Sequence, residues 1–283
     1  MFKTKIICEA ASSWSGDPDL LKAMIKSASE NGCDLFKTQD YRAKNVPDSD
    51  PDKARYEKYQ MRDELYPKFI QWCKEFGVEP LTTCFNADRC KFLADIGFTK
   101  IKLASISLTN TELIMQAGLH FDEVIISTAM ATQTEIEEAI DLLASNCKKF
   151  SIMACTANYP TKPENANLER INALKTILEG QEYASTGYSD HALDLDVSKC
   201  AISMGISYLE KHFTLSRNTE QIKHVMYEGG KPLTTHEISI EPYELKELSD
   251  WRDKVAVMKG DGEFKSNEIE KAIKNRYRGR YGK

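Results

Sequence analysis

The sequence predicts a single-domain α/β protein, a (β/α)8 TIM barrel. Short β-rich runs alternate with amphipathic helical patterns along the chain, about eight times in all. Polar side chains recur where these runs end, and the length of 283 residues suits one barrel. We expect the barrel to span residues 1–258, followed by a short charged C-terminal tail at 259–283. The predicted strands, in order, are 5–9, 35–39, 80–83, 100–103, 124–127, 151–154, 184–187 and 208–212.

The helical patterns between these strands carry recognisable start signals. Asp17 followed by Pro18 is typical of an N-cap and first turn. Thr132 and Glu135 predict a capping box ahead of an apolar helix face, and Asn167 precedes another such face. We interpret these apolar stripes as the surfaces that pack on the sheet.

Two long polar segments interrupt the alternation. Residues 41–59 follow the second strand, and residues 217–239 follow the last one. Loops after the strands of such a barrel emerge at the face that carries the chemistry. Both segments are therefore candidate lids of a site, although a plain solvated excursion remains an alternative for each.

Composition narrows the classes of partner. Hydrophobic residues make up 41% and charged residues 29%, the net charge is −5, and no apolar run approaches a membrane span. Apart from a basic stretch at 271–283, nothing indicates nucleic-acid binding. The eight cysteines form no Cys-x-x-Cys motif, and we interpret Cys8, Cys84 and Cys155 as small buried hydrophobes. We expect a cytoplasmic protein without a nucleic-acid or membrane partner.

Polar side chains at the strand ends point to one shared site. The carboxyl ends of parallel barrel strands meet at one face, and burying so many polar groups in a core without partners would be costly. The candidates are Glu9, Lys37, Gln39, Thr83, Lys102, Ser105, Ser127, Tyr159, Ser189, His191, Glu210 and His212.

The residue types in this set suit particular ligands. Lys37 and Lys102, with the hydroxyl groups, suit a phosphate or a carboxylate. His191 and His212, beside Glu210, suit a divalent metal with positions left open for a substrate. The plainer alternatives are an ordinary ion pair for each lysine and a strand-capping hydrogen bond for each histidine.

At these residues the chain resembles the N-acetylneuraminate (sialic acid) synthase family, including its pseudaminic and legionaminic acid relatives. The resemblance covers essentially the whole barrel, in order and at equivalent strand ends. The matching segments include Cys8-Glu9, Gly16-Asp17, Phe36-Lys37-Thr38-Gln39, Thr82-Thr83-Cys84-Phe85, Lys102-Leu103-Ala104-Ser105, Ile126-Ser127-Thr128-Ala129-Met130, Tyr159-Pro160-Thr161, Gly187-Tyr188-Ser189-Asp190-His191 and Glu210-Lys211-His212-Phe213.

The resemblance implies a transferase that condenses phosphoenolpyruvate with an amino-sugar aldehyde. The products are a 2-keto-3-deoxy sugar acid, of the nonulosonic or sialic acid kind, and phosphate. His191 and His212 match the ligands of Mn²⁺ or Mg²⁺, which polarises the aldehyde oxygen. Lys37, Thr83, Lys102, Ser105, Ser127 and Ser189 match the positions that hold phosphoenolpyruvate. Glu9, Gln39, Tyr159 and Glu210 match positions around the acceptor and the reacting carbons, with Glu9, Glu210 and Lys37 as the catalytic candidates.

Several positions depart from the family pattern on the acceptor side. Ser13-Trp14-Ser15-Gly16 stands where the family has Asn-His-Asn-Gly, and Ser107 stands where a glutamate contacts the acceptor. Ala157 replaces a serine or threonine, and Thr235 before His236 replaces an aspartate. The absence of two acceptor-facing carboxylates argues against assuming N-acetylmannosamine as the acceptor.

Family members usually continue into a small antifreeze-like domain whose arginine reaches the partner subunit. The sequence stops about where that domain would begin, so we expect a divergent member without it and a possible homodimer. Arg276, Arg278 and Arg280 either substitute for that arginine or, more plainly, are surface charge.

Two other functional classes stay open at this point. One is a catalytically silent barrel that keeps the phosphoenolpyruvate pocket. The other is a Schiff-base aldolase that uses Lys102 or Lys37 and no metal. The presence of both histidines, both lysines and Glu210 together favours the metal-dependent synthase.

Overall fold

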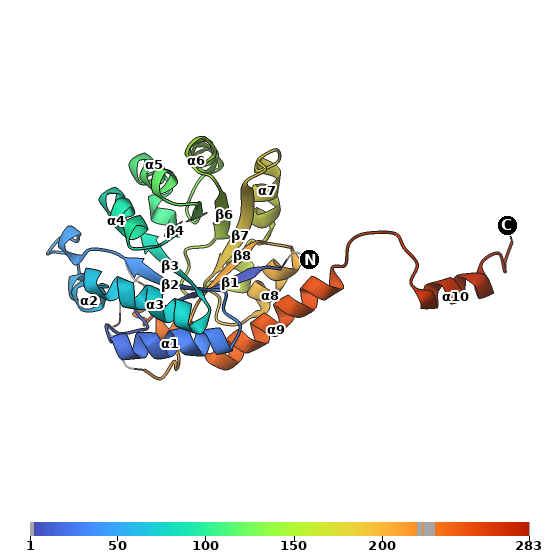
Figure 1. The fold of residues 1–283 in the computed structure, drawn as a ribbon, viewed down its shortest axis with the longest axis horizontal. Coiled ribbons are helices and arrows are strands. Elements are labelled where there is room, and N and C mark those ends of the chain that lie inside the picture. The colour runs from blue at the N-terminus through green and yellow to red at the C-terminus, as the bar shows by residue number, and fades with distance from the viewer. Residues whose placement is uncertain (1–2, 220–222, 224–229, 283) are drawn as a thin grey trace.

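Eight parallel strands close into one barrel in the computed structural model, which describes residues 3–219, 223 and 230–282 (Figure 1). Each strand pairs with the next along the chain, and the last pairs with the first. The predicted single-domain barrel is therefore confirmed. The strands are β1 Lys5–Glu9, β2 Leu35–Asp40, β3 Glu79–Cys84, β4 Lys100–Leu103, β5 Glu123–Ser127, β6 Phe150–Cys155, β7 Ala184–Asp190 and β8 Tyr208–His212.

Helices surround the barrel in Figure 1, and their starts follow the signals in the sequence. The side chain of Asp17 accepts hydrogen bonds from the backbone N–H groups of Asp19 and Leu20, and Thr132 with Glu135 forms the predicted capping box. The helices around the barrel are α1 Pro18–Glu30, α3 Tyr66–Phe76, α4 Cys90–Asp95, α5 Thr111–His120, α6 Gln133–Asn146, α7 Glu169–Ile177, α8 Asp196–Ser203 and α9 Pro242–Met258.

Strand β7 runs further than predicted. It continues past Gly187 to Asp190, because Ser189 and Asp190 pair with Glu210 and Lys211 of β8. Polar residues normally argue against a buried strand, but both of these side chains have hydrogen-bond partners inside the protein. Ser189 thus lies in the strand and does not follow it.

The segment 41–59 was predicted to be a loop, but it contains the helix α2 Lys53–Tyr59. The backbone of α2 lies close to Gly16 in the β1–α1 connection. A Cβ atom at Gly16, which has φ of +75°, would lie 2.7 Å from the carbonyl oxygen of Lys58. This close approach of the two backbones needs glycine at position 16. The other predicted loop, 217–239, lies partly outside the described residues.

Alternate residues of each strand point inward and fill the barrel in layers. The middle layer is apolar and consists of Ile7, Leu35, Leu81, Ile125, Met153 and Tyr208. At the amino ends of the strands, the buried carboxylate of Glu123 accepts hydrogen bonds from Ser151 Oγ and Tyr208 Oη, each at 3.0 Å. The opposite layer, at the carboxyl ends, is polar.

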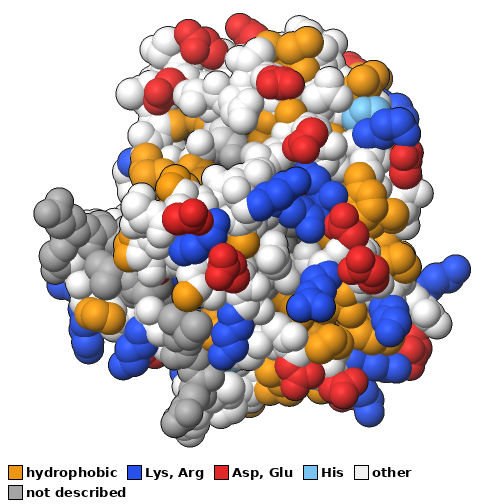
Figure 2. Space-filling model, turned by 90° about the vertical axis from the view of Figure 1, so that its left-hand side faces the viewer, with side chains coloured by type: hydrophobic (Ala, Val, Ile, Leu, Met, Phe, Trp, Pro, Cys, Tyr) orange, Lys and Arg blue, Asp and Glu red, His pale blue; other side chains and the backbone are white. Residues whose placement is uncertain are grey.

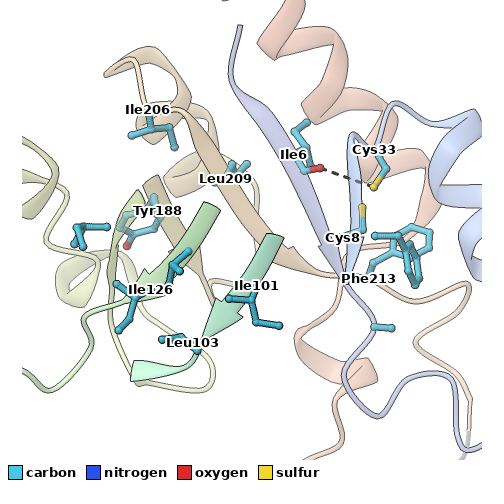
Figure 3. Close-up of a cluster of buried hydrophobic side chains, with 14 of the residues drawn as sticks. Ile6, Cys8, Cys33, Ile101, Leu103, Ile126, Tyr188, Ile206, Leu209 and Phe213 are labelled. Atoms are coloured by element: carbon cyan, nitrogen blue, oxygen red, sulfur yellow. Dashed lines mark hydrogen bonds between the residues drawn. The ribbon is translucent and has the colours of Figure 1, made fainter. Parts of the chain in front are cut away.

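Residues that point outward from the strands pack against the helices and form the larger core. Figure 3 shows part of this core, with Ile6 and Cys8 of β1, Ile101 of β4 and Leu209 of β8, none of which is exposed. The outward-facing side chains are therefore mainly apolar, whereas the inward-facing side chains at the carboxyl ends of the strands are polar.

Beyond α9 the chain extends to the helix α10 Glu268–Tyr277, which stands apart from the barrel in Figure 1. All of its residues are exposed, and the guanidinium groups of Arg276 and Arg280 each lie 5.2 Å from the ring of Tyr277. Within the described part of the chain, no helix has the length and apolar character needed to span a membrane.

Candidate active site

A small, deep cavity of about 90 Å³ lies at the carboxyl ends of the strands. Every site residue predicted from the sequence lines it, although the strands that supply them are far apart in the chain. Most lie within strands, while Ser105, Tyr159 and His191 lie just after β4, β6 and β7. The lining residues are Glu9, Lys37, Gln39, Thr83, Phe85, Lys102, Ala104, Ser105, Ser127, Cys155, Tyr159, Ser189, His191, Glu210 and His212.

Three lining residues, Phe85, Ala104 and Cys155, are missing from the sequence-based set. Cys155 is buried, as expected from the sequence, but it also lines the cavity, which was not predicted. Ser151, Met153 and Cys155 are every second residue of β6, so all three side chains point into the barrel. This alternation could have been used to predict the position of Cys155 from the sequence. Burial raises the pKa of Cys155 to about 11, so its side chain is a thiol at neutral pH.

An ion cluster around Lys37 joins strands β1, β2, β3 and β8. The ammonium group pairs with Glu9 Oε2, lies 3.3 Å from Glu210 Oε2 and donates to Thr83 Oγ1 at 2.8 Å. Glu9 Oε1 also accepts a hydrogen bond from the backbone N–H of Ala11 at 2.6 Å. Burial raises the pKa of Glu9 to about 7, although the charge of Lys37 acts in the opposite direction. Glu9 is therefore able to take up and release a proton near neutrality.

Glu210 differs from Glu9 in its charge state. Burial alone would raise its pKa, but the ammonium groups of Lys102 and Lys37 bring it down to about 2, so Glu210 is ionised. Its Oε1 accepts a hydrogen bond from Ser189 Oγ at 3.1 Å. Lys102 Nζ donates to Ser127 Oγ at 2.6 Å and to the carbonyl oxygen of Leu103 at 3.1 Å. Burial lowers the pKa of Lys102.

Two imidazole rings form one side of the cavity. The ring centroids of His191 and His212 are 5.6 Å apart, and the ring of Tyr159 lies 4.0 Å from that of His191. His191 Nδ1 lies 3.0 Å from the carbonyl oxygen of Thr156. A carbonyl only accepts, so Nδ1 carries the hydrogen and Nε2 keeps a free lone pair. Burial lowers the pKa of both histidines, and both rings are neutral at pH 7.

These histidines fit a divalent metal. Neutral imidazole is the form that binds metal ions, and Nδ1 of His212 is buried in the cavity wall without a hydrogen-bond partner. Among the described residues, no cluster of three or more His, Cys, Asp and Glu side chains has the arrangement of a metal site. The pair itself offers two neutral imidazole rings, and a metal bound by them would keep its other positions open to substrate.

A larger outer chamber of about 640 Å³ adjoins the deep cavity and shares His212, Tyr159, Ser105 and Cys155 with it. The segment after β2 supplies much of its wall, including Tyr41, Arg55 and Tyr56. That segment lies at the left of Figure 1, and Figure 2 shows this side of the molecule, where acidic and basic side chains are interspersed.

The charged residues that line this chamber, Arg42 and Arg55, both have acidic partners. Arg42 pairs with Asp40 at 2.8 Å, and Arg55 pairs with Asp52 at 3.2 Å. The chamber wall thus carries little uncompensated charge.

The positions that depart from the family pattern fall in different places. Ala157 and Thr235 line the outer chamber, whereas Ser107 is buried beside Ile106, which lines it. His236, which follows Thr235, is buried, and its Nδ1 lies 2.7 Å from Thr214 Oγ1.

The β1–α1 connection divides between two cavities. Ala11 and Ser12 line the outer chamber. Trp14 and Gly16 line a separate groove of about 590 Å³.

A closed parallel barrel with a polar, ion-paired cavity at the carboxyl ends of its strands defines a (β/α)8-barrel enzyme. The chain belongs to the NeuB family, whose model matches residues 24–264. The predicted resemblance to the sialic acid synthases is thereby confirmed.

Curated relatives are similar to this chain over most of their length. The N,N'-diacetyllegionaminic acid synthase of Campylobacter jejuni is 29% identical over 95% of this chain and 81% of its own. The enzyme of the same name from Legionella pneumophila is also 29% identical, over 95% of this chain and 77% of its own.

Solved structures agree with the fold. The N-acetylneuraminic acid (sialic acid) synthetase of Leptospira borgpetersenii, in complex with citrate, matches with a TM-score of 0.85 at 24% identity, over 99% of this chain and 93% of its own. A spore coat polysaccharide biosynthesis protein of Bacillus subtilis matches with a TM-score of 0.78 at 26% identity, over 98% and 77% of the two chains.

Proposed function

We propose that this enzyme condenses phosphoenolpyruvate with an amino-sugar or related aldehyde, giving a 2-keto-3-deoxy sugar acid and phosphate in nonulosonic acid biosynthesis. The deep cavity carries this proposal, because it brings two lysines and several hydroxyl groups against a proton-carrying carboxyl group and two neutral histidines. Relatives of the chain that are named as legionaminic acid synthases support it.

Phosphoenolpyruvate fits the deep cavity by charge. Lys37 and Lys102 supply ammonium groups, and Thr83, Ser105, Ser127 and Ser189 supply hydroxyl donors for a phosphate and a carboxylate. When Glu9 is protonated, the two lysines outnumber the one remaining carboxylate, Glu210. The cavity then has the positive charge that an anionic substrate needs.

The proton transfers belong to Glu9. C3 of phosphoenolpyruvate forms a bond to the aldehyde carbon while water adds at C2. Glu9, with its pKa of about 7, delivers its proton to the former aldehyde oxygen and then takes the proton of this water. Cleavage of the bond between C2 and the phosphate oxygen then yields the ketone, and the C2 hydroxyl proton leaves with phosphate. Glu210, with its pKa of about 2, is too acidic to carry protons, and its charge acts to raise the pKa of both lysines.

A divalent Mn²⁺ or Mg²⁺ held by His191 and His212 would supply a Lewis acid for the aldehyde oxygen. The outer chamber, which reaches His212, Tyr159 and Gln39, takes the acceptor sugar. Because Arg42 and Arg55 already have acidic partners, we favour an uncharged acceptor over a sugar phosphate. A cytoplasmic location suits the eight free cysteines, and a homodimer stays a prediction.

One observation favours a second candidate, a Schiff-base aldolase. Lys102 is buried and its pKa is lowered, which is how amine nucleophiles are prepared for attack on a carbonyl. Borohydride would trap the lysine on a carbonyl substrate in that mechanism, and chelators would leave its activity intact.

The test measures phosphate release from phosphoenolpyruvate with Mn²⁺ and a panel of acceptors: N-acetylmannosamine, its 6-phosphate and a di-N-acetylated 6-deoxy hexose. Wild type is compared with His212→Ala and with His120→Ala, a control at the end of α5. We expect release that depends on the acceptor, disappears with His212→Ala and with chelator, and persists with His120→Ala. Activity that survives chelation, together with trapping of the lysine on a carbonyl substrate by borohydride, would favour the aldolase instead.

A further inference from the structure

A fully buried ion pair lies directly behind the two histidines. Asp190 precedes His191, Lys211 precedes His212, and the two face each other across β7 and β8. Side chains alternate along a strand, so these two point away from the cavity, and neither is exposed. Figure 3 shows Tyr188 and Leu209, which precede Asp190 and Lys211 by two residues and therefore lie on the same outward-facing side of these strands.

The ammonium group of Lys211 donates hydrogen bonds to residues on both sides of His191. Its Nζ lies 2.9 Å from Asp190 Oδ2, 2.5 Å from the carbonyl oxygen of Ala192 and 3.2 Å from that of Asp194. An ammonium group has three hydrogens, and all three have acceptors here. The turn that carries His191 is thereby tied to the residue next to His212.

Asp190 extends this arrangement to the helix behind it. Its Oδ1 accepts the backbone N–H of Ala192 at 2.8 Å, and its Oδ2 accepts the hydroxyl of Ser198 in α8. The carboxylate therefore fixes the position of the turn as well as of the lysine. Buried ion pairs often add little to stability compared with apolar residues, so a role in specifying geometry explains this one better.

We propose that Asp190 and Lys211 form a positioning pair that sets the separation and orientation of the His191 and His212 rings for a divalent metal. This inference rests on the metal site of the proposed function. Neither residue contacts the substrate in this role. Both act through the backbone on each side of His191. Residues that orient metal-binding histidines typically change metal affinity roughly 10–100-fold when they are replaced.

The test is the dissociation constant of Mn²⁺, measured by titration calorimetry on the full chain without substrate. The main variant is Asp190→Asn with Lys211→Met, which leaves no uncompensated buried charge. Tyr188→Phe is the matched control, because Tyr188 lies on the same strand and face as Asp190. This substitution removes a buried hydrogen bond of 2.8 Å from the Tyr188 hydroxyl to the carbonyl oxygen of Ala166. Near-ultraviolet circular dichroism reports whether each variant is folded.

We expect the double variant to bind Mn²⁺ roughly 10–100-fold more weakly, and Tyr188→Phe to bind it like the wild type. A folded double variant with the affinity of the wild type would overturn the inference. If the double variant does not fold, Ser198→Ala is the deciding variant. We expect it to bind Mn²⁺ more weakly than the wild type, and an unchanged affinity would count against the inference.

Failure of the proposed metal site looks different. In that case the wild type itself does not bind Mn²⁺, or His212→Ala binds it equally well. If Mn²⁺ binding is lost with His212→Ala but unchanged in the double variant of Asp190 and Lys211, only the positioning role is rejected.

Discussion

Replacing Lys37 with methionine tests the ion cluster of the deep cavity most directly. Lys37 is 3% exposed and is the cation shared by Glu9 and Glu210. Removing one partner of a buried ion pair leaves an uncompensated charge and costs about 3–5 kcal/mol. Domains of this kind are stable by only about 5–15 kcal/mol, so the loss should be large.

The cost of Lys37→Met should depend on pH, with a sign that Glu9 sets. Burial raises the pKa of Glu9 from 4.5 to about 7, so its contribution to stability is present below pH 4.5 and is lost as pH rises to 7. Without Lys37 this pKa rises further, so the loss of stability continues above pH 7. The difference between variant and wild type should therefore be larger at pH 8 than at pH 6.

Urea unfolding at pH 6 and pH 8 measures this difference. Lys26→Met, at a side chain that is 59% exposed, is the control for loss of a lysine, and Glu9→Gln with Lys37→Met should recover part of the stability at pH 8. A cost that is equal at both pH values, or no cost at pH 8, would show that Lys37 does not compensate these carboxylates.

Two further predictions concern other parts of the barrel. Tyr208→Phe should lower the free energy of unfolding by about 1.5–3 kcal/mol, because the Tyr208 hydroxyl donates to the buried carboxylate of Glu123. Tyr183→Phe, at a residue that is 68% exposed, is the comparison in urea unfolding, and equal effects would contradict the role of Glu123. Cys155, 4% exposed and with a pKa of about 11, should react with iodoacetamide far more slowly at pH 8 than the exposed Cys200, as mass spectrometry of the labelled peptides can show. Equal labelling rates would mean that the deep cavity opens readily.

The site residues at the strand ends could be predicted from the sequence for two reasons. Successive side chains of a strand point to opposite faces, and the carboxyl ends of parallel strands lie at the same end of the barrel. Lys37 and Gln39 of β2, or Glu210 and His212 of β8, share a face by alternation alone. Closure of the barrel then brings these faces together at one end. Cys155 obeys the same rule, and it was missed only because its residue type suggested a hydrophobic core.

The outer chamber could not be predicted in the same way. Arg55 and Tyr56 belong to α2, a short helix without a side-chain cap, inside a segment that looks like a loop. Its backbone lies close to Gly16 of the β1–α1 connection, and no local sequence pattern encodes such a tertiary contact. The end of β7 was underestimated for a similar reason, since the partners that compensate the buried Asp190 include Lys211 of another strand.

The nesting of the two cavities has a kinetic consequence. The apolar layer beneath the site closes the barrel at that level, and the deep cavity shares several of its lining residues with the outer chamber. A molecule in the chamber therefore lies against the wall of the deep cavity. We expect the small anion to bind before the sugar, and a sugar that binds first to slow the entry of the anion.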